Sequence, residues 1–165
     1  MKNIKILFLL LISFITLTSC SFIEEVFAGN FEDSIIEEYK DVTFDVKKQD
    51  DKITLYGSDL TANSIEEDFD VHIVYYKNST LHCLLICQNR EYTAKNLELI
   101  NNFNSQQSRL FAYINFENQL EFHYSHSKLT VNDAIYYTKY FLDKMIFKED
   151  VLNLIKMTKQ SEEII

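Results

Sequence analysis

The chain has 165 residues and an acidic balance, with 16 lysines and arginines against 25 aspartates and glutamates and a formal net charge of −9. An acidic surface repels phosphates and anionic lipid heads, which argues against nucleic acid as a partner and against a polybasic membrane patch. Thirteen phenylalanines and ten tyrosines exclude a disordered chain, because they supply the apolar surface that a folded core requires.

The start of the chain has the pattern of an export signal. Lys2 and Lys5 precede an uncharged, mostly apolar run over residues 6–17. As a helix this run would be roughly 18 Å long, which is too short for a bilayer core of about 30 Å. A charged start followed by such a run indicates a secretory signal. An uncleaved membrane anchor remains the alternative, because uncharged residues continue to Ile23.

The end of this leader, Leu17-Thr-Ser-Cys20, resembles the lipobox of bacterial lipoproteins. The resemblance implies that residues 1–19 are removed as a signal peptide and that lipid is attached to the sulfur of Cys20. Each buried methylene of an acyl chain such as palmitate contributes about 0.8 kcal/mol, so several chains together form a stable membrane anchor. The expected location is the bacterial cell envelope, with the chain lipid-anchored to a membrane and facing the periplasm or the exterior.

The mature chain shows alternating helical and strand periodicity. Thr130 and Asp133 have the spacing of a capping box, with Asp in place of the usual Glu. Apolar positions within residues 151–155 continue either the same helix or a second one after Lys148. The patterns predict a helix from Asn30 to about Lys40, strands at 42–47, 53–56, 69–76 and 81–87, a helix at 92–104, strands at 109–115 and 119–125, and a long helix opened by Thr130.

This order predicts one domain. Residues 20–29 form a lipidated start and a short linker, residues 30–157 form the domain, and residues 158–165 form a frayed tail. Strands joined by short turns pair antiparallel, and helices bury one face of such a sheet. The expected fold class is therefore α+β, with an antiparallel sheet of about six strands, helices on one face and the order α-β-β-β-β-α-β-β-α.

The element order and the stretch over residues 100–120 resemble the YbjN-type domain, a family described as bacterial sensory transduction regulators and similar in fold to type III secretion chaperones. Asn101 and Asn104 match its Asn-x-x-Asn helix end, and coverage runs over about residues 30–157. Where the family often has Gly in the following turn, this chain has Asn118, which tolerates positive φ. The resemblance implies a small binding module without established catalytic residues, and it allows a homodimer. We expect the two helix-end amides to satisfy nearby backbone groups.

The four histidines do not predict a metal site. If residues 77–80 form the hairpin turn, Tyr75 faces His82, and His72 then projects from the opposite face of the sheet to His82. A one-residue bulge would change this register. His123 and His126 lie at a strand end where neighbouring side chains diverge, and zinc would need two more ligands.

The two cysteines of the mature domain predict buried free thiols. Cys83 and Cys87 lie four apart on one expected strand, which places their Cα atoms ~13 Å apart. A disulfide requires at most about 7 Å. His82 and Cys83 point to opposite faces of a strand, so they are not expected to pair for thiol catalysis.

No motif in the sequence indicates catalysis. It has no Gly-x-Ser-x-Gly turn, no glycine-rich phosphate loop and no acidic run with calcium-binding spacing. We therefore expect no catalytic residue, metal or cofactor, and a membrane-anchored interaction module, chaperone-like or regulatory, that binds a protein partner. The alternatives are an envelope enzyme with a site assembled from distant residues and a structural envelope lipoprotein. The candidate binding residues are the sheet aromatics Tyr75, Tyr76, Tyr113, Phe122 and Tyr124.

Overall fold

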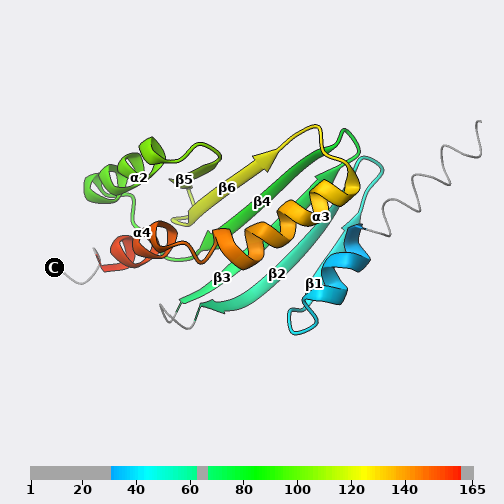
Figure 1. The fold of residues 1–165 in the computed structure, drawn as a ribbon. Helices are drawn as coiled ribbons and strands as arrows, with labels where there is room; N and C mark the ends of the chain where they lie inside the picture. The colour runs from blue at the N-terminus through cyan, green and yellow to red at the C-terminus, as the bar shows by residue number, and fades with distance from the viewer. Residues whose placement is uncertain (1–30, 63–66, 161–165) are drawn as a thin grey trace, which may run out of the picture.

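The computed structural model of the chain describes residues 31–62 and 67–160 (Figure 1). The predicted signal peptide, the predicted lipidation site Cys20 and the predicted linker over residues 20–29 lie outside these ranges. No helix within the described ranges is long and apolar enough to cross a membrane.

The predicted sheet is present and has six strands, all paired antiparallel, in the order β1-β2-β3-β4-β6-β5. Every strand pairs with the next along the chain except that β4 pairs with β6, which leaves β5 at one edge and β1 at the other. The strands are β1 Phe44–Lys48, β2 Lys52–Ala62, β3 Glu67–Tyr76, β4 Thr80–Cys87, β5 Leu110–Ile114 and β6 Leu120–His126.

The hairpin between β3 and β4 differs from the prediction by one residue. Tyr76 pairs with Thr80 and Tyr75 pairs with Leu81, so the turn covers residues 77–79. Ser79 has a φ of 65°, the left-handed conformation that closes a three-residue hairpin loop. The predicted pairing of Tyr75 with His82 is therefore wrong.

Within the described ranges four helices accompany the sheet, and the third of them continues into a π-helical turn. A first helix covers residues 31–38. The predicted capping box is confirmed, because Thr130 and Asp133 bond reciprocally at the start of the third helical segment. The continuation after Lys148 is a separate helix, and residues 158–160 belong to it and not to the predicted tail. The remaining bounds are α2 Ala94–Gln106, α3 Val131–Tyr140 with the π-helical segment η1 Phe141–Met145, and α4 Glu149–Gln160.

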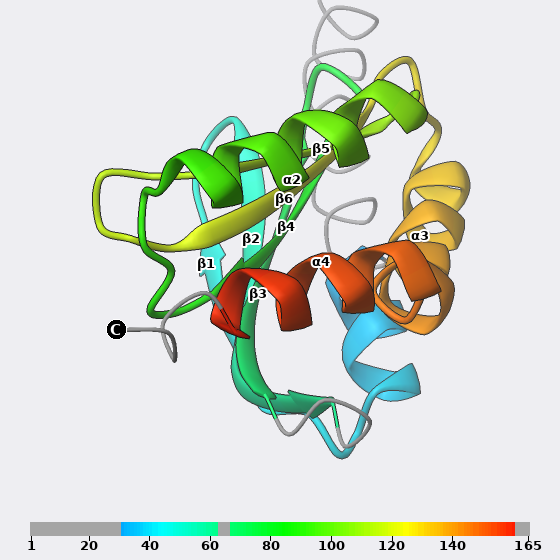
Figure 2. The same cartoon turned by 90° about the vertical axis from the view of Figure 1, so that its left-hand side faces the viewer.

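The helices bury one face of the sheet, as predicted. The ring of Phe103 in α2 meets that of Phe122 at 5.6 Å between centroids, and the ring of Phe141 meets that of Tyr124 at 6.0 Å. Phe31 of the first helix packs on Tyr75 at 5.0 Å. Figure 2 shows α3 and the first helix on one side of the sheet and α2 beside β5. The core thus lies between this helical layer and alternate residues of all six strands.

Candidate functional site

The opposite face of the sheet carries none of the described helices, and a line of rings crosses it. Successive strand partners on this face are Tyr56 of β2, His72 of β3, Leu84 of β4, His123 of β6 and Phe111 of β5. We call these five residues the cross-strand row. Its members are half-buried except Phe111, which is 55% exposed at the sheet edge. The row is a continuous, largely aromatic surface across five strands.

The rings of the row are fixed by their neighbours. The rings of Tyr56 and His72 meet edge to face with centroids 4.7 Å apart. At the other end, Tyr113 stacks on His123 at 4.9 Å. The ammonium of Lys47 lies 4.7 Å above the Tyr56 ring, a cation–π contact that holds one end of the row. Such rigid aromatic groups lose little conformational entropy on binding.

Glu121 lies beside the row, where it is only 8% exposed and accepts several hydrogen bonds. Nδ2 of Asn115 and Nε2 of His123 lie 2.5 and 2.7 Å from its carboxylate oxygens, and the Tyr113 hydroxyl also donates to it. Burial by itself would raise the pKa of Glu121, but the hydrogen bonds from Tyr113, His123 and Asn115 outweigh it and lower the pKa. The hydrogen bond to Glu121 and burial raise the pKa of Tyr113 to about 12.

The surroundings of His72, the second residue of the row, disfavour its charged form. Burial lowers its pKa, and Lys47 adds to this effect, while Asp70 and Glu121 oppose it. A neutral imidazole can pack its ring on Tyr56 without the cost of desolvating a charge. The row is therefore an aromatic surface near neutral pH and becomes more charged on acidification.

The five candidate binding residues divide between the two faces. Tyr76 and Tyr113 lie on the uncovered face, where Tyr76 meets the ring of His82 at 5.6 Å. Phe122 and Tyr124 are 1% and 2% exposed beneath the helices, and Tyr75 packs on the first helix. These three lie on the covered face, so they cannot contribute to a binding surface on the uncovered face.

The histidine prediction is corrected by the hairpin register. His72 pairs with Leu84 and His82 pairs with Val74, so both histidines project from the uncovered face. Within the described ranges, however, no group of three or more His, Cys, Asp or Glu side chains is placed to hold a metal ion. His123 and His126 project from opposite faces, as their spacing in β6 requires.

The cysteine prediction is confirmed. Cys83 and Cys87 are free and buried. Burial raises the pKa of the Cys83 thiol, which keeps it protonated and unreactive. His82 is exposed on the other face of the same strand.

The candidate binding residues from the sequence did not include four residues of the uncovered face: Tyr56, His72, Phe111 and Glu121. Each lies between buried neighbours in a strand, so alternation alone could have identified their common face once the register was known. The missing information was the turn length, which decides which positions of β3 and β4 share a face.

No protein-family model matches the chain, and comparisons with curated proteins and with solved structures find no match. The expected likeness to the YbjN-type domain therefore stays a prediction.

Proposed function

We propose that this chain is a lipid-anchored, non-catalytic interaction module of the bacterial cell envelope that binds a partner protein through the uncovered face of its sheet. The observation that carries the proposal is the cross-strand row, because its rings line up on a face that none of the described helices covers. Aromatic side chains are enriched at the centres of protein interfaces, where they contribute much of the binding free energy.

The charge distribution of this face also favours a protein partner. Lys47 and Lys52 lie over the rings of Tyr56 and Tyr76, while the ionised carboxylate of Glu121 is held by its hydrogen bonds with Asn115 and His123. Charges of both signs around a ring-rich centre match the polar rim and apolar core of a protein interface. This arrangement does not resemble the strongly cationic surface that nucleic acid requires.

Site-specific photo-crosslinking tests the face directly. A benzophenone amino acid replaces Phe111 on the uncovered face or, as a matched control, Phe147 on the helical side, which is 49% exposed. We expect a discrete crosslinked adduct from position 111 and none from position 147 in cells that make the full chain. Tyr56→Ala, at the other end of the row, should weaken the adduct. Equal adducts at both positions, or none at position 111, would overturn the proposal.

The mass of the adduct identifies the occupant. An adduct of twice the mass of the chain would mean that the partner is a second copy, as the resemblance to the YbjN-type domain allows. Any other discrete mass would indicate a different protein, which is the occupant we propose.

Membrane anchoring is tested separately. Cells that make the chain are fed radiolabelled palmitate, and we expect label on the wild-type protein and none on Cys20→Ser. Membrane fractionation should find the Cys20→Ser chain detached from the membrane or retained as an unprocessed precursor. An unlabelled wild-type chain that stays membrane-bound would contradict the lipid anchor and support the uncleaved leader.

A further inference from the structure

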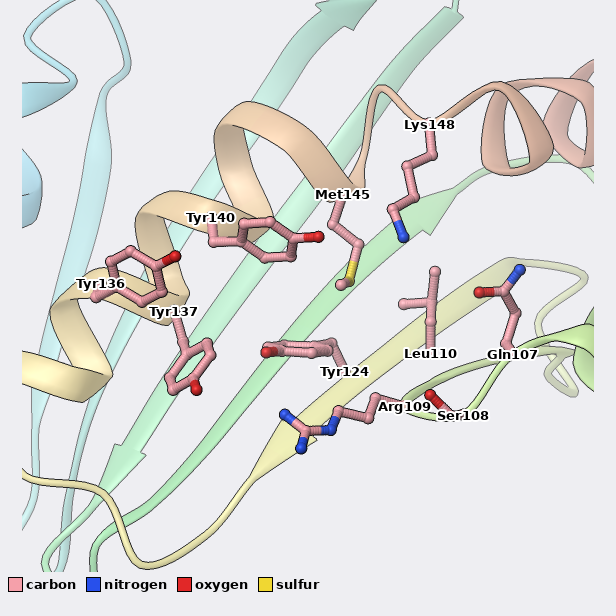
Figure 3. A pocket seen from close by; sticks show the side chains of 10 residues that line it. All are labelled: Gln107, Ser108, Arg109, Leu110, Tyr124, Tyr136, Tyr137, Tyr140, Met145 and Lys148. Carbon is pink, nitrogen blue, oxygen red and sulfur yellow. The ribbon is translucent and has the colours of Figure 1, made fainter.

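A hollow of about 340 Å³ lies on the helical side of the molecule, away from the uncovered face. It opens between the start of β5 on one side and α3 with η1 on the other (Figure 3). Its volume falls in the range of small-molecule sites. The lining residues are Gln107, Ser108, Arg109, Leu110, Tyr124, Tyr136, Tyr137, Tyr140, Met145 and Lys148.

The charge of this lining is opposite to that of the chain. Arg109 and Lys148 are both cationic, and none of the lining residues is acidic, although the whole chain has a net charge of −9. Asp150 accepts a hydrogen bond from Nε2 of Gln107, a lining residue. The lining itself carries two cations and no acidic residue, which creates a local attraction for anions.

Neither cation is neutralised by a carboxylate in an ion pair among the described residues. Arg109 donates from Nη1 to Nε2 of His126 at 2.8 Å and also bonds the hydroxyl of Tyr124. Neither partner is a carboxylate, so they hold the guanidinium in place without pairing its charge, and a guanidinium has further N–H donors to offer. The ammonium of Lys148 makes no ion pair or hydrogen bond with the side chains of the described ranges. Both charges therefore remain available to a ligand.

Aromatic rings line the space between the two cations. In Figure 3 the ring of Tyr124 lies near the centre, with Tyr137 and Arg109 close to its hydroxyl end and Met145 pointing toward it from η1. Burial raises the pKa of Tyr124 to about 12, so its hydroxyl is neutral and can donate a hydrogen bond. Tyr124 and Met145 are nearly buried and form the floor of the hollow, whereas the exposed Tyr136 and the half-buried Tyr137 and Tyr140 offer ring surface to an apolar or aromatic body.

The π-helical segment η1 shapes one wall of the hollow. Its wider turn is closed by the bond from the amide of Ile146 to the carbonyl of Phe141 at 3.2 Å. The segment joins the end of α3 to the stretch that precedes α4, so Tyr140 and Met145, at either end of the turn, both line the hollow. Single π-helical turns within helices occur frequently at functional sites.

We propose that this hollow binds a small organic anion that has an aromatic or apolar body and a carboxylate or phosphate group. The body lies against Tyr137 and Tyr140, over the floor formed by Tyr124 and Met145, and the oxyanion pairs with the guanidinium of Arg109. Lys148 adds electrostatic attraction from the other wall. A planar guanidinium matches both carboxylate and phosphate through paired hydrogen bonds.

The test uses isothermal titration calorimetry on the full chain in a non-ionic detergent. The probes are phenylacetate and phenyl phosphate as anions and phenylacetamide as their uncharged counterpart. We expect at least one anion to bind with one-to-one stoichiometry and about tenfold more tightly than phenylacetamide. The anion that binds more tightly then shows whether the hollow prefers a carboxylate or a phosphate group.

Matched variants locate the site. Arg109→Gln should weaken anion binding by about tenfold and Lys148→Gln by a smaller factor, whereas Lys144→Gln, an exposed cation of η1 outside the lining, should leave it unchanged. Thermal unfolding by circular dichroism verifies that each variant is folded. Failure of both anions to saturate, equal binding of the amide, or equal losses in Arg109→Gln and Lys144→Gln would overturn the proposal. Phe111→Asp, on the uncovered face, should not change anion binding, so the two proposals can fail independently.

Discussion

The side-chain amide of Asn104 bonds both backbone groups of Ala112, as a neighbouring strand would. Oδ1 accepts from the amide of Ala112 and Nδ2 donates to its carbonyl, both at 2.8 Å. Ala112 is the middle residue of β5, which lies at the edge of the sheet. Unpaired groups on an edge strand invite pairing with another chain. Asn104 at the end of α2 therefore closes this edge at its centre.

We predict that Asn104→Ala lowers the free energy of unfolding by about 1–3 kcal/mol, because it leaves two backbone groups of Ala112 without these partners. Urea denaturation followed by circular dichroism measures this loss. The variant should also increase light scattering at high concentration, since the edge of β5 becomes free to pair.

Asn101→Ala is the matched control for this variant. Asn101 lies one turn earlier in α2, is exposed, and its side chain bonds none of the described residues. Its replacement should leave stability within about 0.5 kcal/mol of wild type. Equal losses for Asn101→Ala and Asn104→Ala would show that the contact with Ala112 contributes nothing specific.

Local patterns made much of this fold predictable. Alternation of apolar residues identified all six strands, although β2 continues to Ala62, well beyond the expected end at residue 56. The capping box of Thr130 and Asp133 marked the start of α3. The expected role of the two helix-end amides in satisfying backbone groups is confirmed for Asn104, which bonds Ala112 eight residues away. It is wrong for Asn101, whose exposed side chain bonds none of the described residues. Asn118 was expected to tolerate positive φ in the β5–β6 turn, and its φ is 57°. These features depend on residues close together in the sequence.

The composition of the binding surface could not be predicted because it depends on strand register. Ser79 occupies the left-handed position at the end of the β3–β4 turn, where a glycine would have marked a three-residue loop. With Ser at this position, the sequence is equally compatible with a four-residue turn over residues 77–80. A one-residue shift in register transfers a side chain to the other face relative to its partners. The predicted register therefore placed His72 and His82 on opposite faces of the sheet, and the cross-strand row could not be recognised from it.

We predict that His72 makes stability fall on mild acidification. Burial lowers its folded pKa below the ordinary value of 6.5, so the unfolded chain binds the proton more readily between these two pKa values. Stability that is complete above pH 6.5 is then lost as the pH falls through the folded pKa. The free energy of unfolding, measured by urea denaturation from pH 7.5 to 5, should fall more steeply for wild type than for His72→Gln.

His82→Gln is the control for this pH dependence, because His82 lies on the same face but is exposed. The slope of His82→Gln should equal that of wild type. If His72→Gln keeps the full wild-type slope, burial of His72 is not the cause.

A second pH dependence is expected at lower pH from Glu121. The hydrogen bonds from Tyr113, His123 and Asn115 lower its folded pKa from the ordinary value of 4.5. The stability that they supply is present above that value and is lost as the pH falls through the folded pKa. The difference in unfolding free energy between wild type and Glu121→Gln should therefore shrink from pH 6 to pH 3.

The exposed Glu117, in the turn before β6, supplies the matched control. Glu117→Gln should differ from wild type by a small amount that changes little over this pH range. A constant difference for Glu121→Gln as well would show that its carboxylate is not stabilised by the cluster.

Contacts between distant residues explain why the end of the domain was misplaced. Thr158 looked like the first residue of a polar tail, yet it is fully buried in α4. Its hydroxyl oxygen accepts a bond of 3.2 Å from Nε of Arg90, which lies 68 positions earlier and is 1% exposed. Nothing local to Thr158 indicates this partner. The anion-binding hollow escaped prediction for the same reason, since β5 and α3 meet only in the folded chain.

The contact between Arg90 and Thr158 gives a final prediction. Thr158→Val keeps the shape of the side chain but removes the acceptor of a buried, charged hydrogen bond, a contact that is worth about 1.5–3 kcal/mol. Urea denaturation should show a loss of this size, and amide hydrogen exchange should accelerate in α4. Thr43→Val, at an exposed position before β1, should change neither quantity. If Thr158→Val matches Thr43→Val in both measurements, the hydrogen bond between Arg90 and Thr158 adds nothing specific to the attachment of α4.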